Sequence, residues 1–307
     1  LVKILSGEEQ WRNLTAMDKY YENGPLPSWL GWYVQQWPHS FHAFSAGLTL
    51  AVELFVVWLL FAPRKNSLCR LIAFLIVTPL QIGIILTANY AFLNYLVLFL
   101  GVLLLDDSIL RGAAPAPAAK KPSIAAAVVL TTIFLTSIAS FVMPSFPTAT
   151  LLEPFRIANR YGLFAVMTRN RYEIEFQGTR DGITWVAYPF RYKPQDVRHR
   201  PGLYAPYQPR FEWNLWFASL GSWDENRWVL NTEGRLLENS PPVLELFTSN
   251  PFADKPPIAV RAVAYQYWFT TREERARTGA WWRREALGAY APSAKRAGDG
   301  SITFDSD

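Results

Sequence analysis

The character of the chain changes near Met143. Four stretches before it are almost free of charge, and no comparable stretch follows. About 20 apolar residues in a helix cross the hydrocarbon core of a bilayer. The stretches therefore predict four membrane-spanning helices, near residues 41–61, 68–88, 89–105 and 124–143. The third is the shortest of the four, and it reaches membrane length only if it includes Asn89 and Tyr90.

The predicted fold is a membrane α-helical bundle of about four spans, followed by an α+β domain with an antiparallel, sandwich-like sheet and a helical insertion. Residues 1–40 form an extracytoplasmic segment, 41–143 the transmembrane region and 144–307 an extracytoplasmic domain. An Ala/Pro-rich linker at 112–122 precedes the fourth span, because repeated prolines cannot continue a helix. The chain opens with Leu1 and an apolar run, so we expect an N-terminally truncated fragment.

Positive charges in the short loops predict the orientation of the spans. Lysine and arginine are retained on the cytoplasmic side during insertion. They gather in the links after the first and third predicted spans, whereas the loop at 87–90 has no charge. With four spans, both basic links face the cytoplasm, and the two ends of the chain face away from it. The basic residues are Arg64, Lys65, Arg70, Arg111, Lys120 and Lys121.

Charge and cysteine content argue against several functions. The net charge of +5 comes from many residues of both signs, so nucleic-acid binding is not expected. The single cysteine, Cys69, excludes an internal disulfide, a dithiol redox pair and a cysteine-based zinc site. The C-terminal domain has one histidine, His199, and neither a nucleophile elbow nor a Gly-rich phosphate loop. We therefore expect no metal, no cofactor and no catalytic residues in this domain.

Two ionisable residues lie in the first predicted span. Glu53 is near its middle and His42 near its start. A charge at bilayer depth costs about 2.5 to 3.5 kcal/mol on insertion scales, so such a residue usually faces a partner or a cavity. One interpretation is a proton relay or a buried reactive site. The other, which we prefer, is an interhelical hydrogen bond from a protonated Glu53 to Gln81 or Asn94.

Alternating side chains predict strands in the C-terminal domain. Residues 172–177 and 183–190 alternate around a Gly-rich turn that contains Asp181 and Gly182, which is typical of a β-hairpin. Residues 156–167 and 258–270 are also strand-like. Helices are predicted over 210–220, 226–238 and 242–247.

Tryptophan and arginine are concentrated in the helical insertion and near the end of the domain. One interpretation is core and interfacial packing, because tryptophan buries a large area. The other is a recognition surface, because tryptophan and arginine are enriched in binding hot spots. Both interpretations stay open at this stage. The binding candidates are Arg210, Trp213, Trp216, Trp281, Trp282 and Arg283.

Several segments resemble the lipase maturation factor family, in the same order along nearly the whole chain. An early segment runs from Trp11 to Thr15, and the family usually has Asp at the position of Asn13. A second lies in the loop after the second predicted span, and others lie in the C-terminal domain. The motif positions are Trp11, Arg12, Thr15, Asn89, Tyr90, Asp181, Gly182, Trp185, Asn250, Pro251 and Phe252.

The resemblance implies an integral, multi-pass protein of the endoplasmic reticulum membrane, or of the cytoplasmic membrane in a bacterium, with a luminal or periplasmic C-terminal domain. It implies a non-enzymatic, chaperone-like factor that assists folding and assembly of secreted lipases or other exported clients. The expected partners are membrane lipid and a folding client, which the six binding candidates would contact. The membrane region also looks distantly like vitamin K-dependent carboxylases. The alternative is thus an intramembrane enzyme with a site near Glu53, His42 and Lys3.

Overall fold

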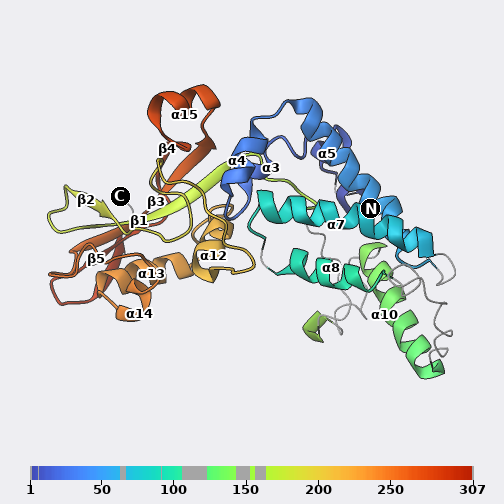
Figure 1. Cartoon of the computed structure of the whole chain (residues 1–307). Coiled ribbons are helices and arrows are strands. Elements are labelled where there is room, and N and C mark those ends of the chain that lie inside the picture. The colour runs from blue at the N-terminus through green and yellow to red at the C-terminus, as the bar shows by residue number, and fades with distance from the viewer. Residues whose placement is uncertain are drawn as a thin grey trace.

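The computed structural model describes residues 2–5, 7–62, 67–90, 92–105, 123–142, 153–155 and 164–305. Long helices fill one end of the molecule, and a strand-rich domain, called the module below (residues 164–305), fills the other (Figure 1). An N-terminal segment contains short helices, and the last two of them lie between the two ends. These helices are α1 (Val2–Leu5), α2 (Glu9–Arg12), α3 (Tyr20–Asn23) and α4 (Trp29–Gln35).

Two helices are long and apolar enough to cross a membrane. The first covers His39–Leu59 and consists of α5 (His39–Ala51), the π-helical turn η1 (Val52–Val56) and α6 (Val57–Leu59). The second covers Leu68–Thr87 within α7 (Ser67–Thr87). Their surfaces carry exposed Leu, Ile, Phe and Trp side chains, as expected of helices that face lipid. The first two predicted spans are therefore confirmed as candidates by length and composition.

The prediction of four spans is not confirmed, because the third and fourth candidates are shorter. Helix α8 (Leu93–Val102) has 10 residues, and such a helix is about 15 Å long, half the hydrocarbon thickness. Asn89 and Tyr90, which we had counted in this span, lie outside the helix and contact the module. Helix α10 (Ile124–Val142) has 19 residues, and its described apolar part, Ile124–Ala139, counts as a shorter apolar helix and not as a candidate span. The linker at 112–122 lies outside the described residues.

One antiparallel sheet forms the centre of the module. Its strands follow the order β2-β1-β3-β5-β6, and β4 also pairs with β3. The predicted hairpin is confirmed, with Thr179 of β1 paired to Trp185 of β2. The strand predicted at 258–270 is confirmed as β3. The strands are β1 (Arg171–Thr179), β2 (Trp185–Ala187), β3 (Ala259–Phe269), β4 (Trp282–Ala289), β5 (Ser293–Arg296) and β6 (Ile302–Asp305).

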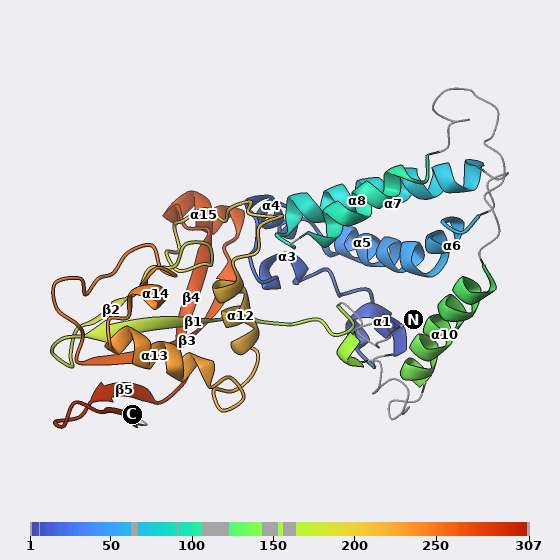
Figure 2. The ribbon, with the colours of Figure 1, turned by 90° about the horizontal axis from the view of Figure 1, so that it is seen from below.

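Helices cover one face of this sheet, so the sandwich-like prediction is wrong in the described part of the module (Figure 2). α12 (Arg210–Ala218) packs on β1, and α13 (Trp228–Leu237) packs on β3 and β5. α14 (Pro241–Leu244) follows α13, and α15 (Arg272–Thr278) connects β3 to β4. Residues 164–167 of the strand predicted at 156–167 form turns and bends and no strand. The rest of that prediction lies outside the described residues.

The core of the module lies between the sheet and its helices. Strand residues Ile174 and Phe176 meet Leu215 of α12 and Leu236 of α13, all fully buried. Apolar residues at helical spacing in α13 and alternating residues in β1 and β3 supply these faces. The module therefore has a core of its own, separate from the packing that joins it to the membrane helices.

Candidate functional site

A second apolar cluster joins the membrane region to the module. Aromatic side chains from the N-terminal segment pack against aromatic side chains from the sheet. The Trp32 and Trp281 rings meet edge to face, with centroids 5.3 Å apart. We call this interface the join. Its buried members are Trp11, Ala16, Met17, Tyr20, Tyr21, Trp32, Ala46 and Ala88 on the membrane side, and Met167, Tyr267, Phe269, Trp281 and Trp282 on the module side.

Arg171, the first residue of β1, is the polar centre of the join. Its side chain is 0% exposed. One guanidinium nitrogen, Nη1, donates to the Glu22 and Gly24 carbonyls, and Nη2 donates to the Pro25 carbonyl at 3.1 Å. Nη2 also pairs with the Glu173 carboxylate. One module side chain thus binds three carbonyls at and just after the C-terminal end of α3, where carbonyls lack partners within the helix.

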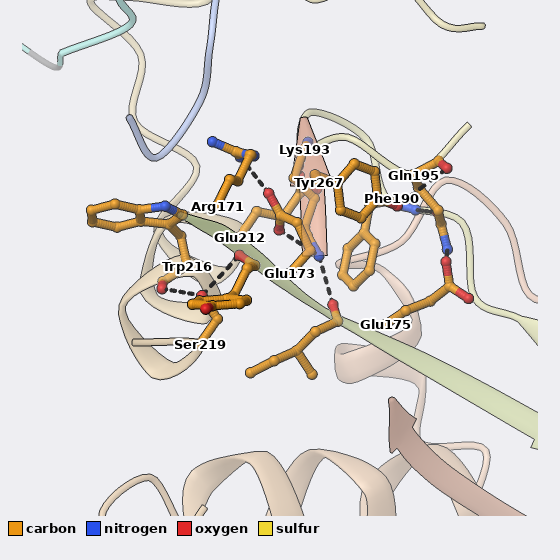
Figure 3. Close-up of polar contacts among 12 residues, drawn as sticks. Arg171, Glu173, Glu175, Phe190, Lys193, Gln195, Glu212, Trp216, Ser219 and Tyr267 are labelled. Atoms are coloured by element: carbon orange, nitrogen blue, oxygen red, sulfur yellow. Dashed lines mark hydrogen bonds and ion pairs between the residues drawn. The ribbon is translucent and has the colours of Figure 1, made fainter. Parts of the chain in front are cut away.

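A buried charge network supports Arg171 from within the module (Figure 3). The Lys193 ammonium lies 2.9 Å from the other Glu173 oxygen and donates to the Ile174 carbonyl at 2.6 Å. Glu212 in turn accepts from the backbone N–H groups of residues 191–193. Burial raises the pKa of Glu212, and these three donors partly offset that rise. Because two cations flank one carboxylate here, a change that removes Arg171 leaves a buried Glu173 with one partner fewer.

Further side chains of the N-terminal segment bind the module backbone. A Glu22 oxygen accepts from the Phe269 N–H at 2.9 Å. Asn23 donates to the Thr168 carbonyl at 2.7 Å. Gln36 donates to the Thr270 carbonyl at 3.2 Å. These bonds tie α3 and the end of α4 to the end of β3 and to the segment before β1.

Asn89 makes a second polar contact between the two parts. Its amide nitrogen donates to the Leu26 and Gly202 carbonyls, both at 3.0 Å. Its oxygen accepts from the N–H groups of Tyr204, at 2.6 Å, and Ala205, at 3.2 Å. Asn89 lies in the connection between α7 and α8, so a single buried amide links the N-terminal segment, the end of a candidate span and a module loop. Such a fully used side chain is expected to hold these segments rigidly.

Replacing Asn89 with Ala is expected to loosen the loop at 202–205. The change removes four hydrogen bonds and leaves backbone groups without partners, at a cost of about 2 to 4 kcal/mol. Limited proteolysis of the protein in detergent should then cut this loop faster than in the wild type. Asn170→Ala is the matched control, since Asn170 is exposed and its amide donates to the Tyr172 hydroxyl. Equal cutting rates in the two variants would contradict the prediction.

Comparison with known proteins identifies the two halves of this architecture. Residues 1–112 match the family described as the lipase maturation factor transmembrane domain. Residues 157–292 match the lipase maturation factor C-terminal domain. The chain belongs to the lipase maturation factor family. The resemblance seen in the sequence is thereby confirmed, and the join is where the two family domains meet.

Relatives in this family cover nearly all of the chain. Lipase maturation factor 1 of Bos taurus is 31% identical over 96% of this chain and 58% of its own length. Lipase maturation factor 1 of Homo sapiens is 30% identical over 95% of this chain and 57% of its own length. Lipase maturation factor 2 of Homo sapiens is 26% identical over 95% of this chain and 57% of its own length. The chain therefore spans less than two thirds of these relatives. No solved structure matches it.

The family-motif residues before the module lie in or beside the join. The Trp11 indole donates to the Phe164 carbonyl at 2.9 Å. The Tyr90 ring lies 5.0 Å from the Phe164 ring and 6.4 Å from the Trp213 ring. Arg12 donates to the Ile4 carbonyl, and Thr15 donates to the Asn13 side chain, so these two order the segment locally.

The motif residues of the module shape its turns. Asp181 accepts from the N–H groups of Ile183 and Thr184, and these bonds hold its pKa well below the usual range. Gly182 has a φ of +77°, which favours glycine in this turn. The Trp185 ring stacks under the Arg261 guanidinium at 4.0 Å.

The Asn250-Pro251-Phe252 motif packs against the hairpin. The Phe252 ring lies so close to Gly178 that a side chain there would overlap it at 2.6 Å. Asn250 accepts from the Phe252 N–H and donates to Asn239. The motif therefore positions a buried aromatic ring beside β1.

The six binding candidates divide into two groups. Trp213, Trp216, Trp281 and Trp282 are each less than 10% exposed. They pack in the join or beside it, which favours the packing interpretation of these tryptophans over an exposed recognition surface. Arg210 and Arg283 are exposed and remain accessible to a binding partner.

The ionisable residues of the first span do not form a common site. Glu53 pairs with Lys3, so the predicted partners Gln81 and Asn94 are wrong; these two bind each other at 2.7 Å. His42 is buried against the Tyr21 ring, about three helical turns from Glu53. No group of metal-ligating residues occurs in the described part of the chain. This geometry gives the intramembrane-enzyme alternative no support.

The role of the residues that do most to build the join was not predicted from the sequence. Arg171 and Asn23 carried no recognised motif, and Glu22 was part of a segment that resembles the family. Asn89, a motif position, was placed at the start of a span. One signal was present: Arg171, Glu173 and Glu175 are alternate residues, so one face of β1 carries three charges. Charges on one face of a strand within an apolar core predict a buried ionic network.

Proposed function

We propose that this chain is a membrane-held maturation factor that assists folding and assembly of secreted lipases or other exported proteins without a chemical step of its own. The observation that supports this most is membership of the lipase maturation factor family across both domains. The join supports it physically. A module fixed to the ends of membrane helices presents its free surface to newly inserted or translocated chains at a constant distance from the bilayer.

We further propose that the module lies on the luminal or periplasmic side, in the endoplasmic reticulum membrane or, in a bacterium, in the cytoplasmic membrane. The basic links after the first and third apolar stretches support this orientation. The N-terminal segment, the loop at 88–90 and the module contact one another, so these parts share one side. Secreted clients pass through that side.

The outer edge of β4 is the surface that best suits an unfolded client. Seven of its eight residues are exposed, and no described strand pairs with its outer edge. An extended peptide adds to such an edge through backbone hydrogen bonds. Arg283, Arg284 and Glu285 place charges along it, which discourages pairing between copies of the module. Arg283, the exposed binding candidate, lies at the start of this edge.

Deletion of the gene in its native host is expected to lower secreted lipase activity several-fold while lipase messenger levels stay constant. Expression of the wild-type protein should restore that activity, and crosslinking should recover a folding intermediate of a secreted hydrolase. Leu287→Asp adds a charge at an exposed position of β4 and should restore less. Leu220→Asp, at an exposed position after α12, is the matched control. Unchanged lipase secretion after deletion, with no captured intermediate, would end the proposal.

A further inference from the structure

An open hollow of about 430 Å³ lies between α4 and α15, beside the join. Figure 1 shows α15 standing at the edge of the module, next to the α4 end of the membrane region. Aromatic rings from α4 and arginines from α15 form its walls, which gives it one apolar side and one cationic side. The lining residues are Trp32, Tyr33, Arg272, Arg275, Ala276 and Gly279.

The cationic wall has unused binding capacity. The Arg275 guanidinium stacks on Trp281, 3.7 Å from the ring centroid, and also lies over Trp32 at 5.0 Å. Its side chain makes no hydrogen bond or ion pair within the described ranges, and its Nε is buried without an acceptor. The Trp32 indole N–H, on a side chain 1% exposed, likewise has no acceptor among the described residues. Buried donors without acceptors are costly, so an anionic ligand that accepts from them would be stabilised.

Nearby carboxylates leave the positive charge largely uncompensated. Glu274, on the same helix, accepts from the Thr271 N–H and pairs with Arg283 at 3.3 Å. Glu273 is exposed at the first turn of α15. Its pKa is lowered mainly by its own backbone N–H and by the Thr271 hydroxyl, and less by Arg272. Arg272 and Arg275 are therefore available to an anion, and planar guanidinium groups suit a phosphate.

The hollow lies at the level of the bilayer surface. Ser28, which caps α4, donates to the Leu86 carbonyl at 3.0 Å. A Cβ on Gly31 would meet the Thr87 carbonyl at 2.6 Å. The start of α4 thus touches the last residues of the candidate span Leu68–Thr87. Trp32 lies one turn further, about 5 Å away, which is within the headgroup layer of about 5 to 8 Å on each side of the core.

Exposed aromatic residues in α4 and just after it match this level. Tyr33 and Trp37 are exposed at 39% and 45%. Tyrosine and tryptophan at the end of a span favour the headgroup zone, where the ring is apolar and the polar tip is wet. An acidic peptide in water would gain little from these exposed rings, whereas a lipid contacts them with its glycerol and upper acyl chain.

We propose that the α4–α15 hollow binds the phosphate of an anionic membrane lipid through Arg272, Arg275 and the Trp32 indole N–H. The ligand would hold α15, and with it the module end of the join, against the bilayer. This site is independent of the proposed function, because it requires a membrane and no client.

The test counts lipid bound to the full chain by native mass spectrometry. The protein is purified in an uncharged detergent and titrated with phosphatidylglycerol or phosphatidylcholine. We expect the wild type to hold one more phosphatidylglycerol than Arg272→Gln/Arg275→Gln, whose apparent Kd should be about tenfold weaker. Arg277→Gln is the matched control, because it removes the same charge from α15 outside the hollow. Equal retention by the double variant and the control would overturn the proposal.

Two competitors identify the source of the anion. Inorganic phosphate at millimolar concentration should leave the lipid bound, and displacement at the same concentration as lipid would overturn a lipid site in favour of free phosphate. A hexaglutamate peptide that displaces the lipid at lower concentration than lipid itself would overturn the lipid site in favour of an acidic peptide.

A single variant tests the site if Arg275→Gln lowers the melting temperature. Arg272→Gln then replaces the double variant, because Arg272 is exposed and its side chain makes no described hydrogen bond. If Arg272→Gln then retains as much phosphatidylglycerol as Arg277→Gln does, the proposed site is wrong.

Discussion

Arg171→Met is expected to separate the N-terminal segment from the module and to lower the stability of the whole protein. The variant loses the bonds to the Glu22, Gly24 and Pro25 carbonyls and leaves Glu173 with Lys193 as its ionic partner. Removing one member of a buried ionic network costs about 3 to 5 kcal/mol. At about 2 to 4 °C per kcal/mol for a domain of this size, the melting temperature in detergent should fall by about 10 °C.

Proteolysis distinguishes opening of the join from general weakening. In Arg171→Met the chain around α3 and α4 should become the first site of cleavage, while the core between β1, α12 and α13 stays protected. Arg180→Met serves as the control, because Arg180 is exposed and donates to one carbonyl, that of Lys255, at 3.2 Å. If both variants melt and digest alike, Arg171 does not hold the join.

Glu233→Met is expected to stabilise the protein, and increasingly so as the pH rises. Glu233 lies in α13 and is 0% exposed. Neither carboxylate oxygen has a hydrogen-bond partner among the described residues. Burial raises its pKa from 4.5 to about 9, and the backbone at Ala262 opposes this only in part. The carboxyl group therefore stays protonated in the folded protein at neutral pH, whereas it ionises in the unfolded chain.

The sign of the pH effect follows from proton uptake. Between pH 4.5 and about 9 the folded state binds more protons than the unfolded state, so stability falls as the pH rises through this window. Each pH unit above 4.5 lowers the free energy of unfolding by about 1.4 kcal/mol, which amounts to about 4 kcal/mol at pH 7.5. Methionine has a similar volume and no charge, so the variant should lack this slope.

The measurement is a melting temperature in detergent at pH 5 and pH 8. Glu233→Met should melt higher than the wild type by several degrees at pH 8 and by little at pH 5. Glu238→Gln, an exposed change at the end of the same helix, should follow the wild type at both values. A gain for Glu233→Met that is the same at both pH values would show that the carboxyl group does not titrate as described.

Local patterns in the sequence predicted the elements whose contacts are local. The hairpin of β1 and β2 followed from alternation around Asp181-Gly182, and its register confirms that pattern. The helices at α12 and α13 followed from apolar spacing. The first two spans followed from their length alone. In each case the residues that decide the structure lie within about one element of one another.

The join was not predictable in the same way, because its contacts connect distant residues. Asn89 binds residues 202–205, and Arg171 binds residues 22–25. No periodicity relates such positions. Composition was also ambiguous. Apolar residues near Asn89 suggested a third span, although the Asn89 side chain binds the backbone of the module. Tryptophan density was compatible with a core or with a surface, and the burial of the four tryptophans, with Trp281 packed on Trp32, separates these interpretations.

Glu53 shows the same limit within the membrane region. The cost of a charge in the bilayer correctly required a partner. The helices next to it in sequence offered Gln81 and Asn94, but the partner is Lys3, 50 residues earlier. Because insertion cost specifies that a partner exists and not where it lies, the choice depends on tertiary structure.

The join has a consequence for how the two family domains depend on the peptide chain between them. Its described contacts run from the N-terminal segment and the loop at 88–90 directly to the module. A protease cut introduced at 144–150 should therefore leave two pieces that stay together in detergent. The halves should also reassemble when they are made as separate polypeptides, much as two subunits of a permanent complex do.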